Sequence, residues 1–257
     1  MWGAAEAAVT CGLVLLLLVA HQLWWTNRQA REGAERKVEA LEREWGERGE
    51  RRDRGDAPSG SSGAGAGAGA GADADVADEP PPDAVPDSGE APGHASTRRQ
   101  KPAPTPDWDQ AYAVLRIPRI GIRVPVAEGI SKSGVLNKGY VGHYPRTAQP
   151  GEGGNFALAG HRNTHGEPFR RIDRLGDGDR LVVETKKAVY TYVVDKTLAQ
   201  TSARDSGVIR PVPRSLVKAG RGYSAPGYYI TLTTCTPEYT SKYRLIVWGK
   251  LQSMRPR

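Results

Sequence analysis

The sequence predicts a mainly β domain, either a barrel or a sandwich, at the C-terminal end of a membrane-anchored chain. Three observations support this prediction. An uncharged apolar run occupies residues 7–25, a low-complexity acidic segment fills the middle of the chain, and side chains alternate with a period of two from Trp108 onward. The 257 residues therefore divide into an anchor, a spacer and one globular domain.

Residues 1–27 are predicted to form a transmembrane anchor. The run AAVTCGLVLLLLVAHQLWW would span roughly 28 Å as a helix, close to the thickness of a bilayer's hydrocarbon core. Trp24 and Trp25 stand where an interfacial aromatic belt is expected. A cleaved signal peptide is the alternative, but its basic n-region and small-residue cleavage site are missing here.

The next two segments differ sharply in composition. Residues 28–54 mix Glu with Arg and Lys at helical spacings, which predicts a charged juxtamembrane helix. Residues 55–107 are rich in Gly, Ala and Pro and carry nine acidic and three basic side chains. Such a segment cannot bury enough apolar surface to offset its ordering entropy, so we expect a disordered linker.

Residues 108–257 carry 24 basic and 11 acidic side chains, a net charge of +13, which suggests anionic surroundings such as wall polymers or phospholipid head groups. The flanks of the apolar run are basic mainly on its C-terminal side, at Arg28 and Arg31. By the positive-inside rule alone, this pattern puts the large domain in the cytoplasm. Basic codons upstream of Met1 would reverse that expectation.

Short alternating segments predict seven or eight strands in the globular domain. The run at 111–126 is broken at Pro118 and Gly121 and is expected to form two strands around a bend. Further strands are expected at 154–161, 179–185, 188–198, 227–235 and 243–251, with short helical turns at 131–137 and 167–175. The chain lacks the regular strand–helix alternation of βαβ units, which favours a barrel or a sandwich.

Cys235 is the only cysteine of this domain, because the other, Cys11, lies in the apolar run. One interpretation of Cys235 is structural, as a buried cysteine that does not react. However, Cys235 ends an apolar strand immediately before Thr236-Pro237, where a rigid scaffold can hold a reactive group. Because a thiol with a pKa near 8.5 is mostly protonated at neutral pH, a nucleophilic role requires a base or a cation nearby.

Two residues are candidates for the base and the cation that the thiol requires. His161 follows a predicted strand and would project from the edge of the scaffold. Arg244 comes nine residues after Cys235, so in an antiparallel pair it would point back toward the thiol. Its guanidinium can stabilise a thiolate or an oxyanion. His165 is expected to be exposed or locally hydrogen-bonded, and no Asp or Asn stands out as a third, orienting residue.

The order His161…Cys235…Arg244, with TLTTC around the cysteine, resembles the sortase family of cysteine transpeptidases. The resemblance covers residues 108–257 and is greatest to class E, the housekeeping type of high-GC Gram-positive bacteria. It implies a closed eight-stranded β-barrel with short helices, and no metal or organic cofactor. It also implies that Cys235 is the nucleophile, His161 the acid and base, and Arg244 the group that holds the substrate backbone and the oxyanion.

Thr234 and His143 are further candidates, for substrate binding, although a structural role for His143 is also open. The implied reaction cleaves an LAxTG- or LPxTG-like sorting signal between Thr and Gly and joins the protein to an amine of a peptidoglycan precursor. The expected partners are secreted proteins with such a signal, the lipid-linked precursor and the membrane, but no nucleic acid. The catalytic domain would lie outside the cell on a single-pass anchor.

Three other functions fit parts of the pattern. A membrane-tethered barrel could bind wall polymers without catalysis. An L,D-transpeptidase would usually have His-Gly-Cys at the nucleophile, whereas Thr233 and Thr234 precede Cys235 here. A papain-like amidase would place its cysteine before its histidine, the reverse of this order.

Overall fold

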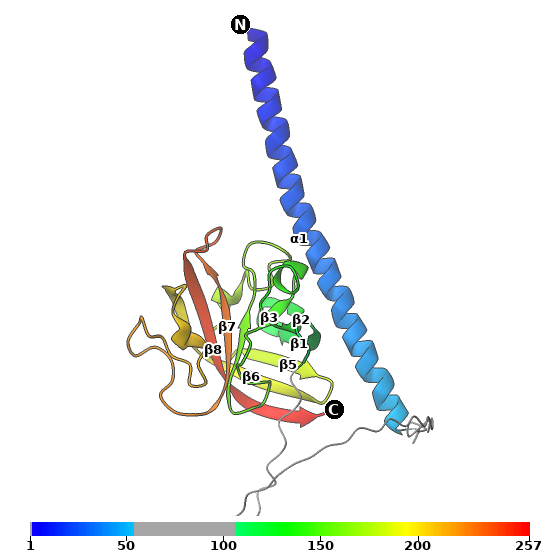
Figure 1. The fold of residues 1–257 in the computed structure, drawn as a ribbon, viewed down its shortest axis with the longest axis vertical. Coiled ribbons are helices and arrows are strands. Elements are labelled where there is room, and N and C mark those ends of the chain that lie inside the picture. The colour runs from blue at the N-terminus through cyan, green and yellow to red at the C-terminus, as the bar shows by residue number, and fades with distance from the viewer. Residues whose placement is uncertain (1, 54–105) are drawn as a thin grey trace, which may run out of the picture. The chain divides into compact units, whose positions relative to one another are not determined.

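A computed structural model describes residues 2–53 and 106–257, and these belong to one compact unit. Except for residues 106 and 107, the segment expected to be a disordered linker, 55–107, lies outside the described residues. The described chain consists of one long helix and one β domain (Figure 1).

Eight strands close into a barrel in the order β1-β2-β3-β4-β7-β8-β6-β5 (Figure 1), which confirms the predicted fold class. The β2–β3 and β4–β7 pairs are parallel, and the other pairs are antiparallel. The strands are β1 (Ala111–Ile117), β2 (Ile122–Glu128), β3 (Val141–His143), β4 (Gly154–Ala159), β5 (Arg180–Thr185), β6 (Ala188–Ser202), β7 (Tyr228–Thr236) and β8 (Tyr243–Pro256). Short 3-10 turns, η1 (Pro118–Ile120), η2 (Leu136–Lys138), η3 (Ile172–Arg174) and η4 (Ser206–Ile209), fill the connections.

The alternating segments correctly locate every strand except β3, which has only three residues and so shows no period. Strands β6 and β8 extend beyond the predicted ends because they pair with each other from Ala188↔Pro256 to Ser202↔Tyr243. The helical turns expected at 131–137 and 167–175 are the 3-10 turns η2 and η3.

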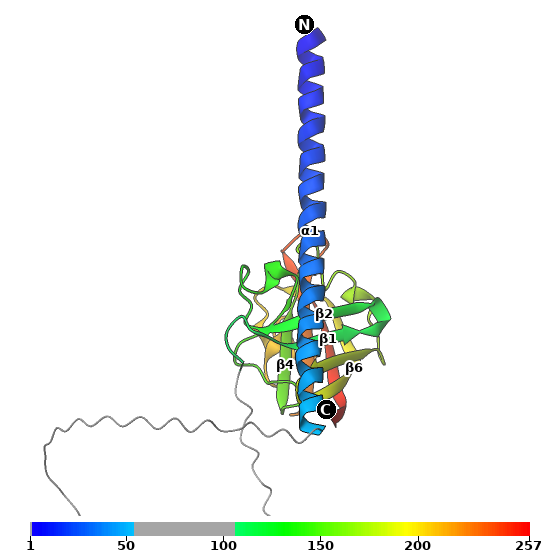
Figure 2. The same ribbon diagram turned by 90° about the vertical axis from the view of Figure 1, so that its right-hand side faces the viewer.

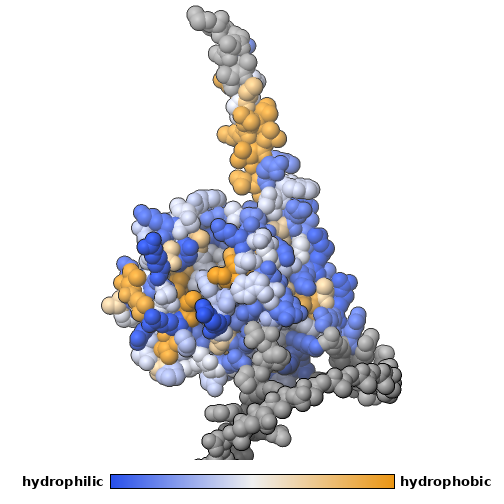
Figure 3. Space-filling model, in the orientation of Figure 1, coloured by the Kyte–Doolittle hydropathy of each residue, from blue (hydrophilic) through white to orange (hydrophobic). Residues whose placement is uncertain are grey.

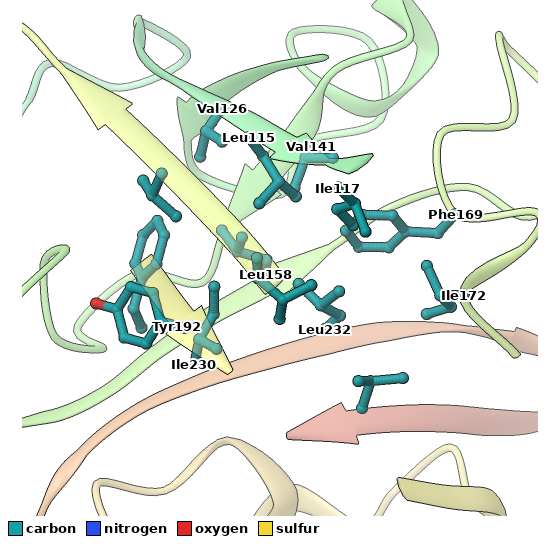
Figure 4. Packing of buried hydrophobic residues seen from close by; sticks show 14 of the residues in the cluster. Leu115, Ile117, Val126, Val141, Leu158, Phe169, Ile172, Tyr192, Ile230 and Leu232 are labelled. Carbon is teal, nitrogen blue, oxygen red and sulfur yellow. The ribbon is translucent and has the colours of Figure 1, made fainter. Parts of the chain in front are cut away.

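The barrel interior is filled by apolar side chains that alternate along each strand (Figure 4). On β7, Ile230 and Leu232 point inward, while Tyr229 belongs to a second cluster on the outer face. Trp248 of β8 lies in that outer cluster, is fully buried, and donates a hydrogen bond from Nε1 to the Val208 carbonyl oxygen at 3.1 Å. Each strand of this region therefore has a defined inner and outer face.

One continuous helix, α1 (Trp2–Asp53), precedes the barrel and runs along strands β1 and β2 (Figure 2). The part of α1 between Val9 and Glu47 contains the one window among the described residues that is apolar enough to cross a membrane, by length and composition alone. The apolar part is visible in Figure 3 as a band above the polar surface. After the exposed apolar side chains between Val9 and Trp25, five side chains on one face of the helix are buried: Ala30, Ala34, Val38, Leu41 and Trp45.

Candidate active site

Parallel strands β4 and β7 bring His161 and Cys235 to the same edge of the barrel. The register of the two strands pairs Ala159 with Thr233. His161 comes two residues after Ala159, and Cys235 comes two residues after Thr233. Gly160 continues the ladder by donating from its backbone nitrogen to the Thr233 carbonyl oxygen at 3.2 Å. The imidazole and the thiol are thus carried by adjacent, hydrogen-bonded chains.

Arg244 lies directly opposite Cys235 in the antiparallel β7–β8 pair, as the nine-residue spacing predicts. Directly opposed residues project from the same face of a sheet. Arg244 donates from Nη1 to the carbonyl oxygens of Ser241 and Tyr243 at 2.8 and 2.9 Å. Within the described part of the chain it forms no ion pair with a carboxylate, so the guanidinium keeps donors available for another group.

The three side chains share the outer face of the barrel, because Leu158 and Leu232 on the same strands point inward. They line one open cleft with a volume of about 920 Å³. Leu23, Trp24 and Asn27 of α1 also line it. Residues that lie 221 positions apart in the sequence, Leu23 and Arg244, therefore border the same cleft.

The ring of His161 is held by two contacts. Its Nε2 lies 3.0 Å from Oδ1 of Asn137, on turn η2. Because an amide oxygen only accepts, Nε2 donates the proton, and the neutral ring then carries its lone pair on Nδ1. The ring of His165 stacks on the ring of His161, with 5.3 Å between the centroids. Asn137 corrects the expectation that no Asn orients the histidine.

Burial lowers the pKa of His161 below its usual value of 6.5, and the neighbouring His165 and Lys132 add to this effect. Desolvation penalises the charged form, and nearby positive charge does the same. The neutral imidazole therefore predominates near pH 7, which leaves His161 able to accept a proton.

Two threonines tie β7 to β4 behind the nucleophile. Thr234 donates to the Gly160 carbonyl oxygen at 2.8 Å, and Thr233 donates to that of Leu158 at 3.1 Å. Thr234 borders the cleft but is only 2% exposed, and its hydroxyl is occupied by this bond. The structure thus gives Thr234 a role in fixing the strand that carries Cys235.

Arg162, which no sequence pattern singled out, joins the segment after His161 to the end of β7. Its Nη1 donates to Thr236 Oγ1 at 3.0 Å, and Nη2 lies 3.3 Å from the carboxylate of Asp173. Only 7% of this side chain is exposed. An arginine directly after the candidate histidine is the sequence signal that could have identified it.

His143 is not brought to the cleft, which corrects its candidacy for substrate binding. It lies on β3 and is fully buried. Its Nδ1 is 2.7 Å from a Glu128 carboxylate oxygen and 3.0 Å from the Tyr112 hydroxyl, while Nε2 is 2.9 Å from Thr147 Oγ1. His143 is therefore the structural histidine that the sequence left as an alternative.

The fold and the site define a closed β-barrel with a cysteine, a histidine and an arginine at neighbouring strand ends. Among the residues that the structure describes, no three His, Cys, Asp or Glu side chains are grouped so that they could hold a metal ion. The family model described as "Sortase domain" matches residues 115–252. The chain belongs to the sortase family, whose members are cysteine transpeptidases.

The relatives confirm the class E resemblance. Sortase SrtE1 of Streptomyces coelicolor is 40% identical over 257 residues, covering 98% of this chain and 57% of that protein. This chain therefore spans little more than half the length of SrtE1. Sortase SrtE2 of the same organism is 31% identical over 252 residues, covering 96% of this chain and 79% of that protein.

Two solved structures are similar over the barrel. A crystal structure of sortase E1 from Streptomyces coelicolor, with a tripeptide in its active site, has 52% identity and a TM-score of 0.55. The match covers 58% of this chain and 92% of the chain in the sortase E1 structure. Sortase E from Streptomyces avermitilis has 42% identity and a TM-score of 0.51, covering 58% of this chain and 93% of that one.

Proposed function

We propose that this chain is a membrane-anchored cysteine transpeptidase. It would cleave a C-terminal LAxTG- or LPxTG-like signal between Thr and Gly and join the protein to an amine of a peptidoglycan precursor. The observation that carries the proposal is the convergence of Cys235, His161 and Arg244 on one cleft from three adjacent strands. Membership of the sortase family supports the same reaction.

In the first half-reaction, the Cys235 sulfur attacks the carbonyl carbon of the Thr–Gly bond, and the thiol proton passes to His161. The neutral form of His161, favoured by its lowered pKa, is the form that accepts this proton. Arg244 faces the oxyanion of the tetrahedral intermediate from across the β7–β8 pair. His161 then protonates the leaving glycine amine, the C–N bond breaks, and a thioester to Cys235 remains.

In the second half-reaction, an incoming amine attacks the thioester carbonyl. His161 accepts a proton from this amine and returns it to the departing Cys235 sulfur, so the free thiol is regenerated. The net result exchanges one amide bond for another, with no oxidant or cofactor consumed.

The substrate and the location follow the same proposal. The tripeptide in the active site of the related sortase E1 supports a peptide ligand for this cleft. The apolar segment of α1 would anchor the enzyme with the barrel outside the cell, next to secreted proteins and lipid-linked precursors. A protease-sensitive tag after Arg257 should be cleaved in intact cells, and protection until lysis would contradict this orientation.

The reaction is tested by incubating the full chain in detergent with LAxTG and LPxTG peptides and a small amine. Mass spectrometry should detect a product in which the fragment ending in Thr is joined to the amine. A wall-binding barrel without catalysis would give no product, and a buried, inert Cys235 would also resist native-state thiol labelling.

A further inference from the structure

The charged helix after the apolar segment is docked on the barrel by a stripe of apolar side chains. Val38, Leu41 and Trp45 pack with Ala111, Val114, Ala127 and Val135 in one buried cluster. Next to it, Glu42 forms ion pairs with Arg116 and Arg123 on the adjoining strands β1 and β2. This part of α1 is thus a packed component of the catalytic unit.

The same helix holds a turn of unusual backbone that follows His161. The backbone is left-handed at three successive residues, with φ values of +52° at His165, +84° at Gly166 and +54° at Glu167. Residues other than glycine rarely adopt this conformation. Two residues of α1 bind this turn. Asn27 accepts from the Gly166 backbone nitrogen at 3.3 Å, and Arg31 donates to the Gly166 carbonyl oxygen at 3.0 Å.

Glu167 is the centre of this contact. Its side chain is only 5% exposed, and a buried carboxylate needs hydrogen bonds or a positive charge nearby to offset the loss of hydration. Asn27 donates to Oε1 at 2.9 Å, and Arg31 and Arg170 each lie 2.8 Å from Oε2. Two of its three partners therefore come from α1. The ring that this turn carries, His165, is the one that stacks on His161.

The second contact of His161, with Asn137, also depends on a turn that packs on α1. Turn η2 presents Asn137 to the imidazole, and its flanks pack on the helix. Val135 lies in the buried cluster with Val38. At Gly139 the backbones approach so closely that a Cβ would lie 2.8 Å from the Ala30 carbonyl oxygen.

We infer that the barrel-facing side of α1 over residues 27–45 is a positioning element of the active site, which fixes His161 by holding both the His165–Glu167 turn and the Asn137 turn. This inference rests on the proposed transpeptidase function for its effect on rate. The functional unit would then begin within the juxtamembrane helix, well before residue 108.

The test uses the full chain in lipid nanodiscs with substitutions that do not line the cleft. Val38→Asp places a charge in the buried cluster and should undock the helix, while Arg31→Ala removes two contacts to the strained turn. Two variants serve as controls. Val38→Ile keeps an apolar side chain at the buried position, and Arg43→Ala changes an exposed residue of the same helix. Steady-state kinetics and hydrogen–deuterium exchange are measured for each variant.

Small displacements of a catalytic group can cost up to about 100-fold in rate. We expect kcat to fall about tenfold in Val38→Asp and about threefold in Arg31→Ala, with KM within about twofold of the parent. Exchange should rise in residues 136–139 in Val38→Asp and in residues 165–167 in both variants, but stay unchanged in β7 and β8. The two control variants should match the parent.

A kcat within twofold of the parent for Val38→Asp would overturn the inference. A fall in kcat without faster exchange in either segment would overturn it as well. If the parent itself forms no product, the proposed function fails. Hydrogen exchange alone then decides whether α1 holds the two turns, since unaltered protection in Val38→Asp would contradict it.

Discussion

Removing the Asn137 amide should slow the enzyme modestly. Asn137→Ala deletes the acceptor that lies 3.0 Å from His161 Nε2 and so frees the ring to rotate and to change tautomer. A hydrogen bond of this kind contributes about 0.5–1.5 kcal/mol, and the lower part of that range applies because Asn137 is solvent-exposed. A loss of about 0.5–1 kcal/mol corresponds to a fall of about 2- to 5-fold in kcat/KM.

Asn137→Asp gives the same site a distinct pH signature. In the parent, activity should fall as the pH drops through the pKa of His161, which burial holds below 6.5. A carboxylate within about 4 Å stabilises the charged imidazole by at least about 1 kcal/mol, and this stabilisation raises the pKa of His161. The acid limb of the kcat/KM profile should therefore move to higher pH.

The assay measures transpeptidation of an LAxTG peptide from pH 5 to pH 9, with Lys138→Ala as a control at the exposed neighbouring position. The control should reproduce the parent profile. An unchanged rate for Asn137→Ala, together with an acid limb that stays fixed in Asn137→Asp, would refute the assignment of Asn137 as the residue that orients His161.

Three further changes test other parts of the structure. Arg244→Lys keeps the charge but loses the planar fork, so kcat should fall roughly 100- to 1,000-fold; near-normal activity of Arg244→Ala would show that Arg244 is not needed. Trp248→Ala empties a fully buried site and should lower the free energy of unfolding in urea by about 3–5 kcal/mol; a loss below about 1 kcal/mol would contradict this. Burial raises the pKa of Asp205, but hydrogen bonds from Ser215 and other groups outweigh this and hold it below 3.8. Its stabilisation should be present above pH 3.8 and lost as the pH falls through the lower folded pKa, so the stability difference from Asp205→Asn should shrink on acidification.

Much of the barrel is predictable from the sequence because its strands have one inner and one outer face. The period of two in β7 and β8, together with the nine-residue spacing, is enough to predict that Cys235 and Arg244 face each other. The pairing of β4 with β7 is harder to predict, because parallel neighbours that are far apart in sequence leave no turn signal. This long-range register is what puts His161 beside Cys235.

Two features of the site are harder to predict from local sequence patterns. Asn137 reaches His161 from 24 residues upstream, through a loop whose geometry depends on packing against α1. The docked face of α1 does leave a signal, since Ala30, Ala34, Val38, Leu41 and Trp45 recur at helical spacing. The surrounding charges obscure this signal, because they dominate the composition of the segment and indicate only a charged helix.

The proposed reaction requires Cys235 to form a covalent acyl intermediate with the sorting signal. Intact-protein mass spectrometry of the full chain, quenched with acid after brief exposure to an LAxTG peptide without an amine acceptor, tests this directly. The expected result is an added mass equal to the acyl fragment that ends in Thr, mapped to Cys235 and absent from Cys235→Ala. No adduct on the parent protein under conditions of turnover, or the same adduct on Cys235→Ala, would contradict it.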